Sequence, residues 1–313
     1  MRFKNVLPTI LVITLVAWGI FFAVSKSKIA QAPVRPSSAG MNFGAQAFIL
    51  PVTETTYLPI RNFNIADPEL EAKAAGLFDV HSEKYLYSKN INERLPIASV
   101  VKLMTAIVIM ENLALNDIYT VAAEDINVDG KGADLSKGEK IKGGDLFKIM
   151  LIKSSNDAAL TFARQAERQG INLVARLNEK AKLLGMNDSK FTDPAGLDDS
   201  DAFSTVDDLI KLVRYVEKYP IIWETLTTRI ADVGSADGAY QHHLINTNQL
   251  LERMPNIIGG KTGYTDGALE TMVLEVSING GRDKLVSILL GSRDRFGETK
   301  QLIEWGVSAY RWK

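Results

Sequence analysis

Three short motifs in a fixed order constrain this chain more than any other feature of its sequence. They are Ser99-Val-Val-Lys102, Ser154-Ser-Asn156 and Lys261-Thr262-Gly263. Together they supply a hydroxyl nucleophile, several groups that can carry protons, an amide and a cation. This combination predicts an active site that transfers an acyl group through a serine.

The first motif opens a predicted helix over residues 99–115. Ser99 and Lys102 are three residues apart, so their side chains share one helix face. A serine hydroxyl needs a base, and a lysine amine can be that base when burial or a second cation such as Lys261 favours its neutral form. The plain alternative is a serine helix cap followed by a solvated lysine.

The second motif interrupts an apolar pattern that predicts a helix over residues 144–166. Ser154 is positioned to relay a proton between Lys102 and a leaving amine. Asn156 can bond both a substrate carbonyl and the lysine. The alternative is a helix boundary or kink, because small polar residues favour helix ends.

The third motif lies in a strand pattern beside turn signals. A glycine inside a strand marks a close backbone approach, here by a ligand lying along an edge strand. Lys261 and Thr262 offer a charge and a hydroxyl to an anionic substrate end. The alternative is a turn with an exposed lysine.

An uncharged apolar run covers residues 6–24, VLPTILVITLVAWGIFFAV. As a helix it would span roughly 29 Å, close to the thickness of a bilayer core. Arg2 and Lys4 on its short flank favour an N-in orientation. Ala30-Gln-Ala32 resembles a signal-peptide cleavage site, so a cleaved signal remains the alternative to an uncleaved anchor.

These features divide the chain into three predicted parts. Residues 1–25 form a transmembrane signal anchor or a signal peptide. Residues 26–65, rich in Pro, Ser, Ala and Gly, form an extended linker. Residues 66–313 form the catalytic domain, exported in either case.

Composition excludes several classes of protein. The net charge of −1 and the lack of a long basic tract argue against binding to nucleic acid. The absence of cysteine excludes disulfides and a thiolate nucleophile. His242 and His243 are adjacent, point to opposite faces of a strand and make a poor metal site. No metal and no cofactor are predicted.

The predicted elements indicate an α+β fold. Strands at residues 77–80 and 85–87 form a hairpin, and strands at 271–278 and 284–290 flank the turn Asn279-Gly280-Gly281. Between these ends lie helical patterns. Strands at both ends of the sequence predict an antiparallel sheet built from N- and C-terminal segments, with a helical insertion. The helices cover residues 99–115, 144–166, 172–184, 205–219 and 301–310.

The sequence around the motifs resembles the serine D-alanyl-D-alanine carboxypeptidases, the low-molecular-mass penicillin-binding proteins. The similarity runs from about Leu77 to Trp312. It lies in the segments Pro96–Ala106, Ser154–Ala159, Leu184–Asn187, Phe191–Asp198, Asn246–Leu251, Ile258–Thr265 and Leu290–Phe296. The resemblance implies a serine β-lactamase/DD-peptidase-like fold.

The resemblance also implies a reaction cycle. Ser99 attacks the carbonyl of the penultimate D-Ala of a peptidoglycan stem peptide, with Lys102 as base. The terminal D-Ala leaves, protonated through Ser154 and Lys261, and water hydrolyses the acyl-enzyme. Penicillins and other β-lactams acylate the same serine as covalent inhibitors. The implied location is the bacterial cell envelope, at the extracytoplasmic face of the cytoplasmic membrane or secreted.

The implied binding residues lie mainly on the third motif. The backbone N–H groups of Ser99 and Tyr264 form an oxyanion hole. Thr262 and Arg295 hold the terminal carboxylate, with Arg293 as the alternative to Arg295. The implied substrate-binding set is Thr262, Gly263, Tyr264 and Arg295.

The chain departs from the family pattern in several places. Ser155 stands where many relatives have glycine. Ala268-Leu269-Glu270 replaces the usual Ala-Gly, which predicts a narrower strand edge for the substrate. The sequence stops at Lys313, where relatives often continue into a β-rich domain and an anchor, so the N-terminal segment is expected to provide the anchoring.

Three other functions remain open. A D,D-endopeptidase or weak transpeptidase changes only the acyl donor or acceptor. A class A β-lactamase needs a glutamate in a Glu-x-x-Leu-Asn context after the second motif, where this chain has Gly196-Leu197-Asp198. A non-catalytic peptidoglycan-binding envelope protein would not need the intact set of motif residues.

Overall fold

The computed structural model describes residues 58–126 and 134–312. The predicted anchor over residues 1–25 and the cleavage site at Ala30-Gln-Ala32 lie outside this range. Within the described residues, none of the helices is long and apolar enough to cross a membrane. The fold described below is that of the unit that begins at Glu54.

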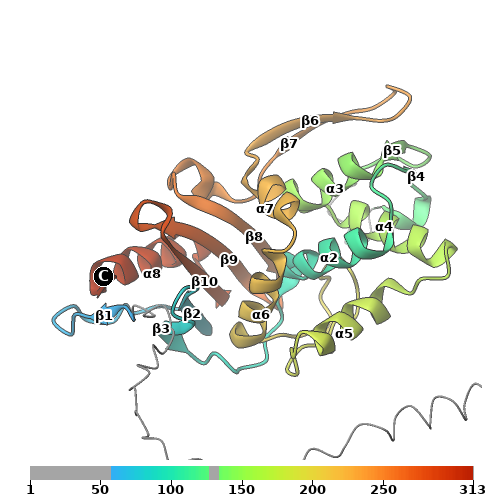
Figure 1. Ribbon diagram of the computed structural model, residues 1–313. Coiled ribbons are helices and arrows are strands. Elements are labelled where there is room, and N and C mark those ends of the chain that lie inside the picture. The colour runs from blue at the N-terminus through green and yellow to red at the C-terminus, as the bar shows by residue number, and fades with distance from the viewer. Residues whose placement is uncertain (1–57, 127–133, 313) are drawn as a thin grey trace, which may run out of the picture. The chain divides into compact units, whose positions relative to one another are not determined.

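A five-stranded antiparallel sheet forms the centre of the fold, in the order β3-β2-β10-β9-β8 (Figure 1). The N-terminal hairpin consists of β2 (Ala74–Asp79) and β3 (Lys84–Lys89). The other strands are β8 (Ile257–Thr265), β9 (Leu269–Ile278) and β10 (Asp283–Ser292). The predicted sheet of N- and C-terminal segments is therefore confirmed.

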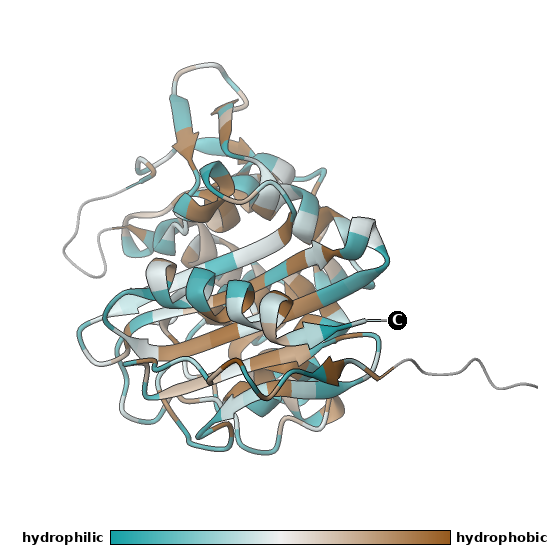
Figure 2. Cartoon of the chain, turned by 90° about the vertical axis from the view of Figure 1, so that its left-hand side faces the viewer, coloured by the Kyte–Doolittle hydropathy of each residue, from teal (hydrophilic) through white to brown (hydrophobic). Residues whose placement is uncertain are grey.

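Side chains alternate between two faces of the sheet, and each face has its own hydrophobic core. Met272, Leu274 and Val276 of β9 belong to one core, which α8 (Arg295–Ala309) covers with Leu302 and Ile303. Figure 2 shows hydrophobic stretches along the strands of this sheet. Helices between β3 and β8 cover the opposite face, which completes a three-layer arrangement.

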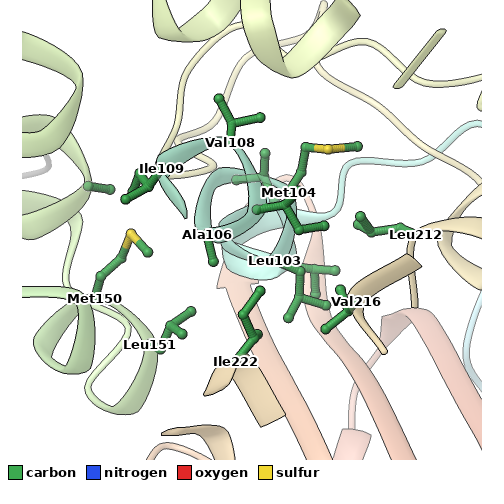
Figure 3. Close-up of a cluster of buried hydrophobic side chains, with 14 of the residues drawn as sticks. Leu103, Met104, Ala106, Val108, Ile109, Met150, Leu151, Leu212, Val216 and Ile222 are labelled. Atoms are coloured by element: carbon green, nitrogen blue, oxygen red, sulfur yellow. The ribbon is translucent and has the colours of Figure 1, made fainter. Parts of the chain in front are cut away.

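Helix α2 (Lys102–Asn112) runs through the middle of the helical part and is buried along most of its length. Figure 3 shows its side chains Leu103, Met104 and Ile109 packed among residues of the neighbouring helices. Because α2 has no solvent-facing side at its start, its first residue, Lys102, is placed inside the protein. The neighbouring helices are α3 (Gly143–Ile152), α4 (Asn156–Arg168), α5 (Leu173–Leu183), α6 (Val206–Val216) and α7 (Pro220–Thr227).

The single helix predicted over residues 144–166 is wrong. The chain leaves α3 at Ile152 and starts α4 at Asn156, so the second motif forms the break. Ser154 has a φ of 63°, a left-handed conformation that ends a helix. Ser155 caps α4 by accepting a hydrogen bond from the Ala158 N–H.

Several observed elements were not predicted from the sequence, or begin at another residue than predicted. The helix predicted over residues 205–219 stops before Pro220, and this proline is the first residue of a helix that was not predicted, α7, where its fixed φ suits a helix start. The hairpin of β6 (Ile230–Gly234) and β7 (Gln241–Ile245) was not predicted. Helix α8 starts earlier than the predicted residue 301 because Asp294 caps it.

Short elements complete the fold. The first of them, β1 (Ile60–Arg61), pairs with β11 (Tyr310–Arg311), although it falls within the predicted linker over residues 26–65. The pairing joins the two ends of the described chain beside α8. The others are the strand pair β4 (Ile118–Thr120) and β5 (Lys140–Lys142) and the 3-10 helices η1 (Ala98–Val101), η2 (Ala123–Asp125), η3 (Gln249–Glu252) and η4 (Asn279–Gly281).

Candidate active site

Ser99 and Lys102 lie on consecutive elements, with Ser99 in η1 and Lys102 at the start of α2. The Lys102 ammonium is fully buried and donates to Ser99 Oγ at 2.7 Å. It also donates to Asn156 Oδ1 at 2.7 Å and to the Ala195 carbonyl at 2.6 Å. The first and second motifs therefore meet at this amine, as the sequence predicted.

Lys261 connects the third motif to the second. Its ammonium, 1% exposed, donates to Ser154 Oγ and to the Thr262 carbonyl, both at 2.7 Å. The left-handed backbone of Ser154 belongs to this arrangement, because strained conformations of this kind persist where surrounding contacts hold them. All three motifs thus converge around two buried lysines.

The electrostatics of the site act most strongly on Lys261. Burial lowers its pKa well below the ordinary value of 10.5, and the positive charges of Lys102 and Arg295 lower it further. A lysine in this environment gives up its proton more readily than an exposed lysine does. Lys261 can therefore accept or return a proton through Ser154 as well as attract an anion.

These groups lie along a cleft of about 310 Å³. Ser99, Ser154, Asn156 and the third-motif residues line it, and the lysines lie below its surface. Thr262 Oγ1 is 2.6 Å from Thr247 Oγ1, so the two hydroxyls lie side by side in the lining of the cleft. The full lining is Ser99, Asp134, Ser154, Asn156, Asp157, Thr247, Thr262, Gly263, Tyr264 and Arg295.

Arg295, and not Arg293, lines the cleft. Its guanidinium donates to the Gly263 carbonyl at 2.8 Å. Burial lowers its pKa and the charge of Glu270 opposes that change. Glu270 also accepts a hydrogen bond from the Arg295 backbone N–H at 2.9 Å. The glutamate that departs from the family pattern thus holds the arginine in place.

Gly263 allows β8 to pass close to the nucleophile. A Cβ built on this residue would lie 2.4 Å from Thr271 Oγ1, 2.9 Å from the Ile97 carbonyl and 3.0 Å from the Ser99 nitrogen. These are contacts that real Cβ atoms rarely or never make. The close approach at this glycine is therefore made by the backbone next to Ser99, whereas the predicted approach of a ligand along the strand edge stays a prediction.

Some groups at the site were not predicted. Asp134 and Asp157 also line the cleft, and the Asp157 carboxylate accepts hydrogen bonds from the backbone N–H groups of residues 134 and 135. Thr247 lies in Asn246–Leu251, one of the segments quoted for the resemblance, and the same is true of Ala195 in Phe191–Asp198. The Ala195 contribution is a backbone carbonyl, which no residue type reveals.

No cluster that could hold a metal ion occurs among residues 58–126 and 134–312. The two adjacent histidines are instead paired singly with carboxylates. His242 lies 2.6 Å from Glu139, and His243 lies 2.7 Å from Asp232.

Comparison with known proteins identifies the family. Residues 61–294 match the family model described as D-alanyl-D-alanine carboxypeptidase, the S11 peptidases. D-alanyl-D-alanine carboxypeptidase DacB2 of Mycobacterium tuberculosis is 30% identical over 77% of this chain and 84% of its own length. DacF of Bacillus subtilis is 29% identical over 77% of this chain, which spans 63% of that relative. A D-alanyl-D-alanine endopeptidase of Escherichia coli is 31% identical over 77% of this chain and 78% of its own length.

Solved structures share the fold. A D-alanyl-D-alanine carboxypeptidase of Mycobacterium tuberculosis superposes with a TM-score of 0.70 at 27% identity, covering 80% of this chain and 96% of that one. Penicillin-binding protein D2 of Listeria monocytogenes, in its ampicillin-bound form, gives 0.65 at 29% identity over 77% and 99%. The predicted DD-peptidase fold is confirmed. This chain belongs to the D-alanyl-D-alanine carboxypeptidase family of serine hydrolases.

Proposed function

We propose that Ser99 carries the acyl group in this chain and that Lys102 is its base. The reaction of the family is the removal of the terminal D-Ala from peptidoglycan stem peptides in the cell envelope. The observation that carries the assignment is the fully buried Lys102 amine, 2.7 Å from Ser99 Oγ. A base must be within hydrogen-bond reach of the proton it removes, and this pair meets that condition.

The remaining groups complete the cycle. After attack, the tetrahedral oxyanion takes hydrogen bonds from the backbone N–H groups of Ser99 and Tyr264. The proton then passes through Ser154 and Lys261 to the leaving D-Ala amine, along the 2.7 Å contact between these two side chains. Water finally attacks the ester and frees Ser99.

The substrate's terminal carboxylate is proposed to bind at the end of the cleft that holds Thr262 and Arg295. The paired hydroxyls of Thr262 and Thr247 supply donors there. The partly buried guanidinium of Arg295 supplies positive charge there, and the amine of Lys261 is buried beneath the cleft. A substrate that lacks a free carboxylate therefore loses its main anchor.

The release of free D-Ala tests this function. Purified enzyme incubated with a pentapeptide stem ending in D-Ala-D-Ala is expected to release one D-Ala per peptide. A D,D-cross-linked dimer is the matched competing substrate, because relatives 31% identical to this chain are named D-alanyl-D-alanine endopeptidases. Cleavage of the dimer without D-Ala release from the monomer would contradict the carboxypeptidase assignment and favour the endopeptidase.

Anchoring is a separate proposal that rests on residues 6–24 of the sequence. Their length and lack of charge suit an uncleaved, N-in membrane anchor, with the catalytic domain on the extracytoplasmic face. The mass of the mature N-terminus tests it. A chain that retains residues 1–25 supports the anchor, whereas a mature chain that starts at Pro33 contradicts it.

A further inference from the structure

The loop between α5 and α6 supplies a contact of the Lys102 amine. The Ala195 carbonyl accepts from Lys102 Nζ at 2.6 Å and from Ser99 Oγ at 3.3 Å. This carbonyl therefore touches both the base and the nucleophile from a segment almost a hundred residues away. Its position depends on the backbone of the loop and not on the alanine side chain.

The number of acceptors around Lys102 matters for catalysis. A charged lysine has three N–H donors, but the neutral form that acts as a base has two and a lone pair. Asn156 Oδ1 at 2.7 Å and the Ala195 carbonyl at 2.6 Å can occupy both. The lone pair is then left facing Ser99 Oγ, the only one of the three partners that has a proton to give.

Asp193 fixes the Ala195 peptide. One carboxylate oxygen accepts hydrogen bonds from the N–H groups of Ala195 at 2.6 Å and Gly196 at 2.7 Å. The other oxygen accepts from the Leu197 N–H at 3.1 Å. Three consecutive amides thus point at one side chain, and this sets the direction of the carbonyls between them.

The loop also packs closely against the residues on either side of Ser99. Gly196 has a φ of 81°, and a Cβ on it would lie 2.1 Å from the Ala98 carbonyl. Thr105 of α2 donates to the Pro194 carbonyl at 2.8 Å. A change in the loop is therefore passed directly to the residues around Ser99.

We propose that Asp193 is a positioning residue: its carboxylate holds the Ala195 carbonyl so that the neutral Lys102 amine aims its lone pair at Ser99. This rests on the proposed role of Lys102 as base. Asp193 is not among the residues that line the cleft. Its loss is therefore expected to slow the chemical step while substrate binding is retained.

Two substitutions of Asp193 remove different numbers of its hydrogen bonds to the loop backbone. Asp193→Ala removes all three acceptor contacts. Asp193→Asn keeps the two contacts of one oxygen but turns an NH2 group toward the Leu197 N–H, where no hydrogen bond can form. Asp199→Asn is the matched control, because Asp199 is exposed on the same loop and its carboxylate accepts from the Asp201 N–H, away from the Ala195 peptide.

The readout is the time course of covalent labelling by a fluorescent penicillin over a range of concentrations. It separates the limiting acylation rate from the half-saturating concentration. For Asp193→Ala we expect the limiting rate to fall roughly 10- to 100-fold, because small misplacements of reacting groups cost up to about 10² in rate. The half-saturating concentration is expected to stay unchanged, with Asp193→Asn intermediate and Asp199→Asn like the wild type.

Other outcomes overturn the proposal. A wild-type limiting rate in Asp193→Ala would show that the carboxylate does not position the base. A fall in the limiting rate together with an equally large rise in the half-saturating concentration would indicate a loop that merely supports the cleft. If Asp193→Ala does not fold, a wild-type rate in Asp193→Asn decides against the proposal. Ser99→Ala is run in the same assay to test the proposed function separately. Covalent labelling of Ser99→Ala would contradict the proposed function, whereas the outcomes above contradict only the role of Asp193.

Discussion

Replacing Lys102 by methionine is expected to lower the rate of acylation by penicillin on the order of 10²- to 10⁴-fold, the usual contribution of a positioned base. Without the amine, the described residues leave Ser99 Oγ with the Ala195 carbonyl at 3.3 Å, an acceptor that cannot act as a base. Methionine has a similar length and no charge to bury, so the fold is expected to persist. Time-resolved labelling of wild type and variant measures the ratio.

Lys102→Arg separates the base from the charge. A guanidinium keeps the positive charge but cannot be deprotonated in a protein. We therefore expect acylation by penicillin to be as slow in the arginine variant as in the methionine variant. Near-wild-type acylation in Lys102→Arg would mean that the site needs a cation at this position and takes its base from elsewhere.

Lys261→Met is expected to reduce D-Ala release strongly while raising the free energy of unfolding at neutral pH. The substitution removes the group that exchanges a proton with Ser154 and attracts the substrate carboxylate. It also removes a buried amine whose charged form is disfavoured by burial and by the nearby cations Lys102 and Arg295. Functional groups of this kind commonly reduce stability in return for activity.

The contribution of Lys261 to the free energy of unfolding depends on pH. Between the lowered pKa of Lys261 in the folded state and its ordinary value of 10.5, the unfolded chain binds one more proton at this site. The free energy of unfolding of the wild type therefore rises with pH across that window, by up to about 1 kcal/mol per pH unit from this residue. Urea unfolding at several pH values is expected to show the advantage of Lys261→Met shrinking as pH rises. Parallel curves would contradict the lowered pKa.

The central sheet could be predicted because its signals are local. The apolar runs of β9 and β10 and the turn Asn279-Gly280-Gly281 lie within one continuous stretch, and Gly280 adopts the left-handed φ of 70° that such a turn uses. The motif residues were predicted for a similar reason. Their chemistry is carried by residue types and by order, and both are visible in a sequence.

The break between α3 and α4 could not be predicted from periodicity, because apolar residues continue on both sides of it. Its cause is tertiary: Ser154 turns to meet Lys261, which is 107 residues further along the chain. The Ala195 carbonyl was missed for another physical reason. Every residue has a backbone carbonyl, so the sequence does not mark the one that contacts Lys102. The fold shows that Asp193 binds the Ala195 N–H and that the Ala195 carbonyl accepts from Lys102.

Covalent labelling of Ser99 is the most direct test of the account. The purified protein is incubated with benzylpenicillin, digested, and its peptides are analysed by mass spectrometry, with Ser99→Ala as the control. We expect a mass increase equal to one intact penicillin on the peptide that carries Ser99, and no adduct in the variant. An adduct on another residue, or an adduct that persists in Ser99→Ala, would contradict the assignment of the nucleophile.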